Sequence, residues 1–323
     1  MRAVLCGQLY TGISSEPLKG ALVLIGDDGR IESVERRETA PEGVPVLDLS
    51  RYTVIPGMVD SHDHLCIDTG DEHAQALESD QYHIVKGLRN ARLMVKGGIT
   101  TLRDVGEKNY TDVTLREALN QGWFPGPRVI SCGKFISRTG GHGWYFGVEV
   151  SGPDEVRRAV REQIKHGAQF IKVMISGGIG TAGSDPRQQE LCDEEIQVLF
   201  EEANRANLKV AAHIHGGTGA RKAILAGLHS LEHGIYLERE DLELMAEKGT
   251  WLVVTYGLTK LALEMPGVPE HFRRKVIEAR GHYSQRIRWA KELGVRVAVG
   301  GDGVHGRPAL ELEALVEAGV APF

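Results

Sequence analysis

The chain has 323 residues, of which 41% are hydrophobic and 25% are charged, and its formal net charge is −6. This length can bury one large core, because single folded domains extend to roughly 250–300 residues. The mildly acidic balance, without a basic stripe that carries interleaved aromatic residues, excludes the composition typical of nucleic-acid-binding proteins.

The sequence carries no sign of secretion or of membrane insertion. The opening segment MRAVLCGQLYTG lacks the apolar region of a signal peptide, and no segment approaches the ~18 apolar residues of a membrane span. The cysteines are scattered and form no C-x-x-C pair, which favours reduced thiols over a disulfide scaffold or a zinc ribbon. We therefore expect a cytoplasmic protein without a nucleic-acid or membrane partner.

Residues 1–57 are predicted to form a small β unit. Short apolar runs alternate with turns, and Asp27, Asp28 and Gly29 have the composition of a hairpin turn between alternating apolar residues. The rhythm of the sequence changes at residue 58, which is where we place the start of a second domain, residues 58–323.

Eight strand-like runs follow, each separated from the next by segments that include amphipathic helices. The runs are 57–64, 98–106, 128–135, 170–178, 209–216, 229–237, 251–257 and 295–303. In the segment 193–207, for example, apolar residues recur at helical spacing behind Asp193, which we expect to be the N-cap. Several of the strands are apolar on both faces, as a parallel sheet covered by helices requires.

Eight strand–helix units in roughly 250 residues predict an α/β fold of the (β/α)₈ barrel type, with the N-terminal unit as part of a β-sandwich. A doubly wound open sheet is the alternative. The sequence has no G-x-G-x-x-G or Walker pattern at a strand–helix turn that would support this alternative.

Metal-compatible side chains stand at the ends of several of these strands. Because catalytic groups of a barrel gather at the carboxyl ends of its strands, we expect these side chains to share one rim. They are His62 and His64, Lys172, His213 and His215, His233, and Asp302. Residues i and i+2 of a strand point to one side, so that His62 and His64 can bind one cation together. Neutral imidazole and carboxylate ligands suit zinc and similar divalent ions.

The segments VIPGMVDSHDH, FIKVMISGG, VAAHIHG, SLEHG and GGDG resemble, in this order, the amidohydrolase superfamily. Within it the chain is most similar to the imidazolonepropionase-like group of metal-dependent Xaa-Pro and Xaa-Arg dipeptidases. The resemblance spans essentially the whole chain. It implies a binuclear hydrolase of amide bonds, with two divalent metal ions that we expect to be zinc.

The resemblance also implies a role for each residue. His62 and His64 would bind the more buried metal, and His213 and His233 the second one. Lys172 would be carboxylated and bridge the two metals. Asp302 would bind the first metal and carry the proton during hydrolysis. His215 is the second choice for the ligand that we assign to His213, and otherwise we expect it to contact the substrate.

The carbamate on Lys172 also has a physical basis. A lysine in an apolar strand is costly to keep charged, so its pKa falls and the neutral amine can add carbon dioxide. A Schiff-base role is the alternative. The four surrounding histidines disfavour it, because Schiff-base chemistry needs no metal cage.

Substrate contacts are expected from loops. In the resembled dipeptidases a histidine of the GGHG loop and a tyrosine after the sixth strand hold the substrate carboxylate, which implies His142 and Tyr236 here. Tyr256, His305 and Arg307 rank lower as pocket residues, and Cys66 is expected only to pack. The expected substrate is a small molecule, a dipeptide or a related amide.

The sequence leaves the exact reaction, the oligomeric state and the C-terminal region open. An imidazolonepropionase-like cyclic amidohydrolase, or a hydrolase of lactones, esters or N-acyl amino acids, is the alternative function. A homo-oligomer is an open possibility, because related enzymes often assemble. The resembled enzymes continue beyond this chain's final EALVEAGVAPF, so we expect a truncated last helix and a sandwich without its C-terminal half.

Overall fold

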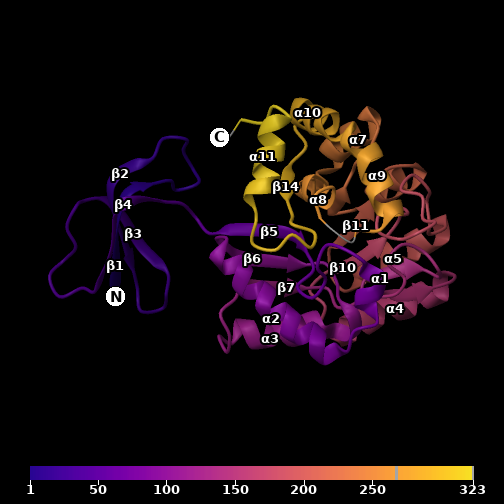
Figure 1. The fold of residues 1–323 in the computed structure, drawn as a ribbon, viewed down its shortest axis with the longest axis horizontal. Helices are drawn as coiled ribbons and strands as arrows, with labels where there is room; N and C mark the ends of the chain where they lie inside the picture. The colour runs from indigo at the N-terminus through magenta and orange to yellow at the C-terminus, as the bar shows by residue number, and fades with distance from the viewer. Residues whose placement is uncertain (266–267, 322–323) are drawn as a thin grey trace. The chain divides into compact units, whose positions relative to one another are not determined.

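The computed structural model describes residues 1–265 and 268–321. The chain divides into two compact units, Met1–Gly57 and a second unit that begins at Met58 (Figure 1). Residues 322 and 323, which the sequence analysis assigns to the second domain, lie outside the described residues.

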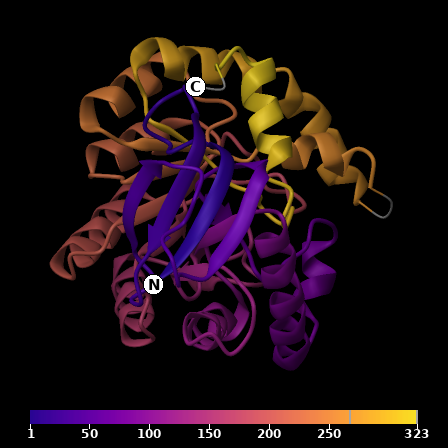
Figure 2. The same ribbon diagram turned by 90° about the vertical axis from the view of Figure 1, so that its left-hand side faces the viewer.

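The first unit is a four-stranded sheet with the order β3-β2-β1-β4. Its strands, which Figure 2 shows side by side, are β1 (Arg2–Leu9), β2 (Leu18–Ile25), β3 (Ile31–Arg36) and β4 (Val46–Val54). The hairpin predicted at Asp27–Gly29 joins β2 to β3, with Gly29 at φ 80°, a conformation that glycine adopts without strain. A small apolar cluster that includes Cys6, Leu9 and Val23 holds one face together.

Eight parallel strands of the described residues form the wall of the second unit. They are β5 (Met58–Asp63), β6 (Ile99–Asp104), β7 (Arg128–Ser131), β10 (Ile171–Met174), β11 (Val210–Ile214), β12 (Ser230–His233), β13 (Trp251–Val254) and β14 (Val297–Val299). One hydrogen-bonded ladder joins β5, β6 and β7, and another joins β10 to β14 in chain order. Two further strands, β8 (Ile136–Arg138) and β9 (Val148–Val150), pair with each other and extend the second ladder beside β10.

Hydrogen bonds at two seams close the wall into a barrel. The amide of Gln169 donates to the carbonyl of Ser131 at 2.9 Å, which joins β7 to the start of β10. The amide of Asp302 donates to the carbonyl of His62 at 2.9 Å, which joins the end of β14 to β5. The predicted (β/α)₈ barrel with an N-terminal sheet is therefore confirmed, and an open doubly wound sheet is excluded.

Helices surround the barrel. The larger ones are α2 (Asp80–Lys96), α3 (Thr111–Asn120), α4 (Pro153–Lys165), α5 (Asp193–Arg205), α6 (Thr218–Leu225), α7 (Arg239–Lys248), α9 (Glu270–Arg280), α10 (Tyr283–Leu293) and α11 (Ala309–Glu317). Two short helices, α1 (Glu72–Ala76) and α8 (Gly257–Ala262), and a 3₁₀ turn, Lys108–Tyr110, lie in the loops. Among the described residues, no helix combines the length and the apolar character that crossing a membrane requires.

The predicted N-cap of α5, Asp193, is wrong by one residue. The cap is Cys192, and Asp193 is the first helical residue. The reason is Glu195, whose carboxylate accepts a hydrogen bond from the Cys192 amide at 2.7 Å and so completes a capping box around the cysteine.

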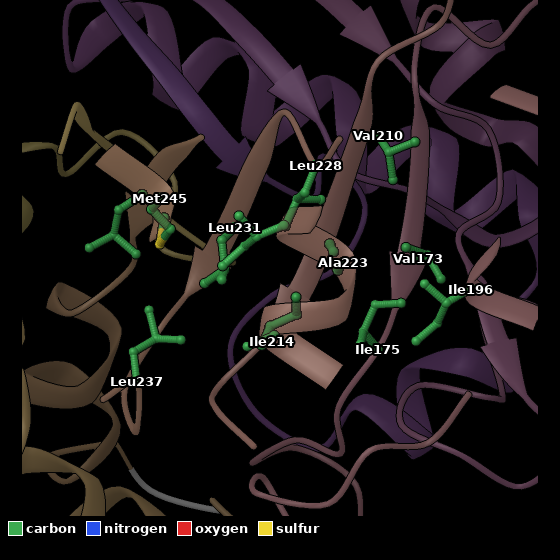
Figure 3. Packing of buried hydrophobic residues seen from close by; sticks show 14 of the residues in the cluster. Val173, Ile175, Ile196, Val210, Ile214, Ala223, Leu228, Leu231, Leu237 and Met245 are labelled. Atoms are coloured by element: carbon green, nitrogen blue, oxygen red, sulfur yellow. The ribbon is translucent and has the colours of Figure 1, made fainter. Parts of the chain in front are cut away.

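The main apolar core lies between the barrel strands and the helices (Figure 3). Val173 and Ile175 pack in one cluster with Ile196 of α5, as Figure 3 shows. Since side chains alternate along a strand, this packing turns Lys172 and Met174 to the barrel interior. Both line the pocket at the carboxyl ends of the strands.

Candidate metal centre

One pocket at the carboxyl ends of the strands collects the predicted ligands. It encloses about 880 Å³, solvent at its mouth included. Its lining includes all six predicted metal ligands, namely His62, His64, Lys172, His213, His233 and Asp302. His142 and His215 line it as well. The structure thus brings together residues that are up to 240 positions apart in the chain.

Three of these side chains form a group that could hold one metal ion. The Nε2 atom of His62 lies 3.4 Å from Oδ1 of Asp302, and Nε2 of His64 lies 3.8 Å from the same oxygen. One donor atom from each residue falls within 4.8 Å of those of the other two. Two imidazoles and a carboxylate at such distances are a suitable donor set for a divalent ion.

The other histidines stand next to this group. The ring of His233 is centred 4.7 Å from that of His62 and 4.5 Å from that of His213. The ring of His215 follows at 4.6 Å from His213 and 5.0 Å from His233. His233, His213 and His215 therefore form a second set of donors, and His233 is the member that adjoins the first set.

Each of the four histidines that we predict as ligands has one ring nitrogen held by the protein. The Nδ1 atom of His62 is bound to Glu232 at 2.7 Å, that of His64 to the Gly106 carbonyl at 2.6 Å, and that of His233 to Thr255 at 2.7 Å. His213 differs, because its Nε2 is bound to the Gly177 carbonyl at 3.1 Å.

These bonds decide which nitrogen faces the pocket. A carbonyl or carboxylate only accepts, so the bound nitrogen of His62, His64 and His213 carries the hydrogen, and the other one keeps a free lone pair. This arrangement is how proteins orient metal-binding imidazoles. The donor set therefore fits divalent metal ions, with Nε2 available on His62 and His64 and Nδ1 on His213.

Burial holds His64, His213, His215 and His233 in the neutral form that binds metals. Burial lowers the pKa of His64 to about 4, against the opposing charge of Asp302, and burial together with His142 lowers the pKa of His215 to about 3. Burial and the adjacent imidazoles also lower the pKa of His213 and His233 well below the usual range.

Lys172 is the largest of the fully buried side chains and is 1% exposed. Burial lowers the pKa of its ammonium group, against the opposing effect of Glu232 and Asp302. Within the described residues its nitrogen forms no hydrogen bond and no ion pair. A buried amine without a partner is the chemical state that carbamate formation requires.

Two of the predicted ligands adopt strained backbone conformations. His233 has φ 73° and Asp302 has φ 51°, in the left-handed region that non-glycine residues seldom occupy. Ser230 and Glu232 face the barrel interior, where they bond Arg103, so alternation would turn His233 outward. The left-handed turn at the end of β12 brings it into the pocket instead. Strain of this kind is characteristic of functional sites.

A buried ion pair of Glu232 and Arg103, which contacts His62, was not predicted from the sequence. Glu232 accepts hydrogen bonds from Arg103 on both carboxylate oxygens at 2.8 Å, and from Ser230 at 2.6 Å. Burial raises the pKa of Glu232, but Arg103 and His62 outweigh burial and lower it to about 2. The signal was present, because Glu232 lies two residues from Ser230 on the inward face and Arg103 lies on the inward face of β6.

Of the two residues predicted to contact the substrate from loops, one lines the pocket and the other does not. His142 lines the pocket, with Nδ1 3.0 Å from Thr181 Oγ1. Tyr236 does not line the pocket formed by the described residues. Its ring lies 4.1 Å from the guanidinium carbon of Arg187 and 5.0 Å from the ring of His282.

The lower-ranked residues also lie apart from the pocket lining. Tyr256 is buried and donates its hydroxyl to the His233 carbonyl at 3.2 Å. His305 is enclosed by Asp63 and Asp68, and Arg307 is exposed. Cys66 packs in an apolar cluster, as expected.

Residues 53–321 match the Amidohydrolase family, and the chain therefore belongs to this family. Ochratoxinase of Aspergillus niger is 33% identical over 96% of this chain and 72% of the relative. Its solved structure superposes with a TM-score of 0.84 at 30% identity, covering 98% of this chain and 80% of that one.

A solved Xaa-Pro dipeptidase with bound methionine in its active site is similar throughout. It has a TM-score of 0.89 and 29% identity, and the match covers 99% of this chain and 84% of that one. A prolidase in complex with N-methylphosphonate-L-proline has a TM-score of 0.87 and 26% identity, with 98% and 84% covered. The resemblance to amidohydrolases of the dipeptidase group is thus confirmed.

Proposed function

We propose that this member of the Amidohydrolase family is a binuclear metal-dependent hydrolase of Xaa-Pro dipeptides or similar carboxylate-bearing amides. The observation that carries the proposal is the pair of adjoining donor sets, in which His62, His64 and His213 each have one ring nitrogen bound by the protein and a free lone pair on the other. The likeness to solved Xaa-Pro dipeptidase and prolidase structures supports the choice of substrate.

The assignment of donors follows the two sets. His62, His64 and Asp302 would hold one ion, and His213 and His233 the other. Lys172 would help to hold both ions as a carbamate, formed when its neutral amine adds carbon dioxide and loses a proton. Imidazole and carboxylate donors make zinc our choice of metal. Bound there, divalent ions would polarise an amide carbonyl and lower the pKa of a water molecule.

The protein's own groups would then handle the proton. Asp302 would take a proton from the attacking water and pass it to the nitrogen of the leaving amine. His142 would orient the substrate through Nε2, because its Nδ1 is engaged by Thr181. Burial lowers the pKa of His142 to about 3, so that it would act as a neutral hydrogen-bonding group. Tyr236 would need its ring to leave Arg187 before it could contact a substrate.

A direct test measures metal content and substrate range together. Metal-free protein is reloaded with zinc or manganese, and bound metal is counted per chain. The loaded enzyme is then assayed with Xaa-Pro dipeptides, N-acyl amino acids, an imidazolone and lactones. We expect two ions per chain and hydrolysis of dipeptides. One ion per chain with turnover of the imidazolone would favour the cyclic amidohydrolase alternative, and absence of metal would refute the proposal.

A further inference from the structure

A carboxylate outside the predicted ligand set also lines the pocket. Glu72 belongs to the loop that follows β5 and is the first residue of the short helix α1. The same loop is fastened to the end of β14, because the amide and hydroxyl of Thr69 both donate to the Gly303 carbonyl, the hydroxyl at 3.0 Å. Glu72 is therefore held on the same rim as Asp302.

Neighbouring loops hold the Glu72 carboxylate in place. The Tyr145 hydroxyl donates to Oε2 at 2.7 Å and lies 3.3 Å from Thr181 Oγ1, which in turn contacts His142. A methyl group built on Gly180 would collide with Oε1, so the carboxylate lies directly against the backbone there. The group is thus fixed by the loop between β8 and β9 and by the loop after β10, as well as by its own loop.

Glu72 nevertheless has no cationic partner. Among the described residues, no lysine, arginine or histidine forms an ion pair with it. Lys275 is the cation with an electrostatic effect on Glu72, but its ammonium group is used by the carbonyls of Gly178, Thr181 and Ser184 at 2.6–2.9 Å.

The other pocket carboxylates are already engaged. Asp68 is paired with Arg89 at 2.6 Å and with His305 at 3.3 Å, and Asp302 belongs to the ligand set. Burial raises the pKa of Glu72 to about 7, while the hydrogen bond from Tyr145 opposes this effect. A positive charge beside Glu72 would stabilise its ionised form, so the carboxylate and a cationic guest would strengthen each other.

We propose that Glu72 forms an ammonium-binding subsite, which selects substrates that carry a positively charged nitrogen. This inference rests on the proposed amide hydrolysis and narrows its substrate class to amides such as dipeptides with a free amino group, rather than N-acyl amino acids. The charge could come from the α-amino group or from a basic side chain.

Matched substrates test the subsite. Alanyl-proline carries an ammonium group where isobutyryl-proline carries a methyl group, and the two compounds are otherwise identical. N-acetyl-lysyl-proline carries its positive charge on the side chain instead. They are assayed with zinc-loaded wild type, Glu72→Gln and Glu270→Gln. Glu270 is the control because it is an exposed acid at the start of α9, away from the pocket lining.

We expect wild type to prefer alanyl-proline over isobutyryl-proline by about 10- to 100-fold in kcat/KM, the range of a charge-assisted hydrogen bond. Glu72→Gln should lose this preference by slowing only the charged substrate, and Glu270→Gln should keep it. If N-acetyl-lysyl-proline also depends on Glu72, the subsite accepts a side-chain ammonium group as well as the α-amino group; if it does not, the subsite accepts the α-amino group alone. An equal loss for charged and neutral substrates would overturn the subsite.

A binding measurement separates this inference from the proposed function. If wild type hydrolyses none of these amides, the proposed function fails, and the subsite is judged by thermal shift with alanyl-proline and isobutyryl-proline. A rise in Tm with the alanyl compound that disappears in Glu72→Gln would support the subsite. The same response to both compounds, or none to either, would refute it.

Discussion

The orientation of His62 depends on residues that are not themselves ligands. Its Nδ1 is bound to Glu232, and both carboxylate oxygens of Glu232 accept hydrogen bonds from Nη2 of Arg103. Partners of this kind fix the tautomer and ring angle of an imidazole and raise its basicity. Glu232 should therefore affect metal binding without contacting a metal.

Glu232→Gln should weaken metal binding at the His62 set by about 10- to 100-fold, since partners of ligating histidines have effects of this size. The measurement is competition with a chelator for zinc. Glu202→Gln is the matched control, because Glu202 of α5 pairs with Arg161 of α4 in a similar two-bond contact. Equal affinities of the Glu232 variant and wild type would contradict the positioning role.

Lys172→Ala should lower both metal content and activity, because it removes the amine that we propose to carry the carbamate. Short carboxylic acids added to this variant should restore part of both, since a free carboxylate can occupy the space of the lost one. Metal analysis with and without added acetate measures the effect. A variant that keeps its full metal content without acetate would rule out a bridging carbamate.

At the scale of the elements, the carboxyl end of β14 presses against β5. A Cβ atom on Gly300 would collide with Cβ of His62 and would fall 2.6 Å from its carbonyl oxygen. The barrel closes at this point, where the amide of Asp302 donates to that same carbonyl. Only a residue without a side chain lets the two strand ends approach so closely.

Gly300→Ala should destabilise the protein by about 1–3 kcal/mol, the usual cost of overpacking, and should reduce metal binding by displacing His62. Gly281→Ala is the control, because Gly281 has φ −67° at the end of α9 and a Cβ there would meet only one atom, at 4.0 Å. Thermal unfolding and zinc titration compare the two variants. Unchanged zinc affinity in Gly300→Ala would show that His62 does not depend on this contact.

The sequence predicted the elements well because their signals are local. Apolar runs followed by glycines correspond to the eight barrel strands. Alternation at the end of β5 predicts that His62 and His64, which is the first residue after the strand, face the same side. His233 shows the limit of such reasoning, because its left-handed turn reverses the side that alternation assigns to it. Glu232 was also missed, since its importance arises from Arg103, which is 129 positions away.

Across the whole molecule, sequence patterns could predict the rim on which residues meet but not their partners there. The ring of Tyr236 packs against Arg187 from another loop, and the spacing of residues in the sequence does not predict this contact. Glu72 likewise is held in place by Tyr145 and Gly180, which come from two other loops. Loop conformation depends on such long-range contacts, and for this reason the substrate contacts were harder to predict than the metal ligands.

The closure of the barrel should also depend on pH through a buried ion cluster. His305, which follows β14, lies 3.2 Å from Asp63 at the end of β5 and 3.3 Å from Asp68. Burial lowers the pKa of His305, but the two carboxylates outweigh burial and raise it to about 10. The protonated imidazole thus links loops from the first and last strands of the barrel.

The stabilisation by His305 should be complete below its unfolded pKa of about 6.5 and should disappear as the pH rises to about 10. One proton limits the slope to ~1.4 kcal/mol per pH unit. Asp68, whose pKa lies below its usual range, would titrate only in acid and so would not contribute here. Urea unfolding of metal-free wild type and His305→Gln from pH 6 to pH 10 measures the difference in unfolding free energy. That difference should be largest at pH 6 and should vanish near pH 10, whereas a constant difference over this range would show that His305 stabilises the fold by packing alone.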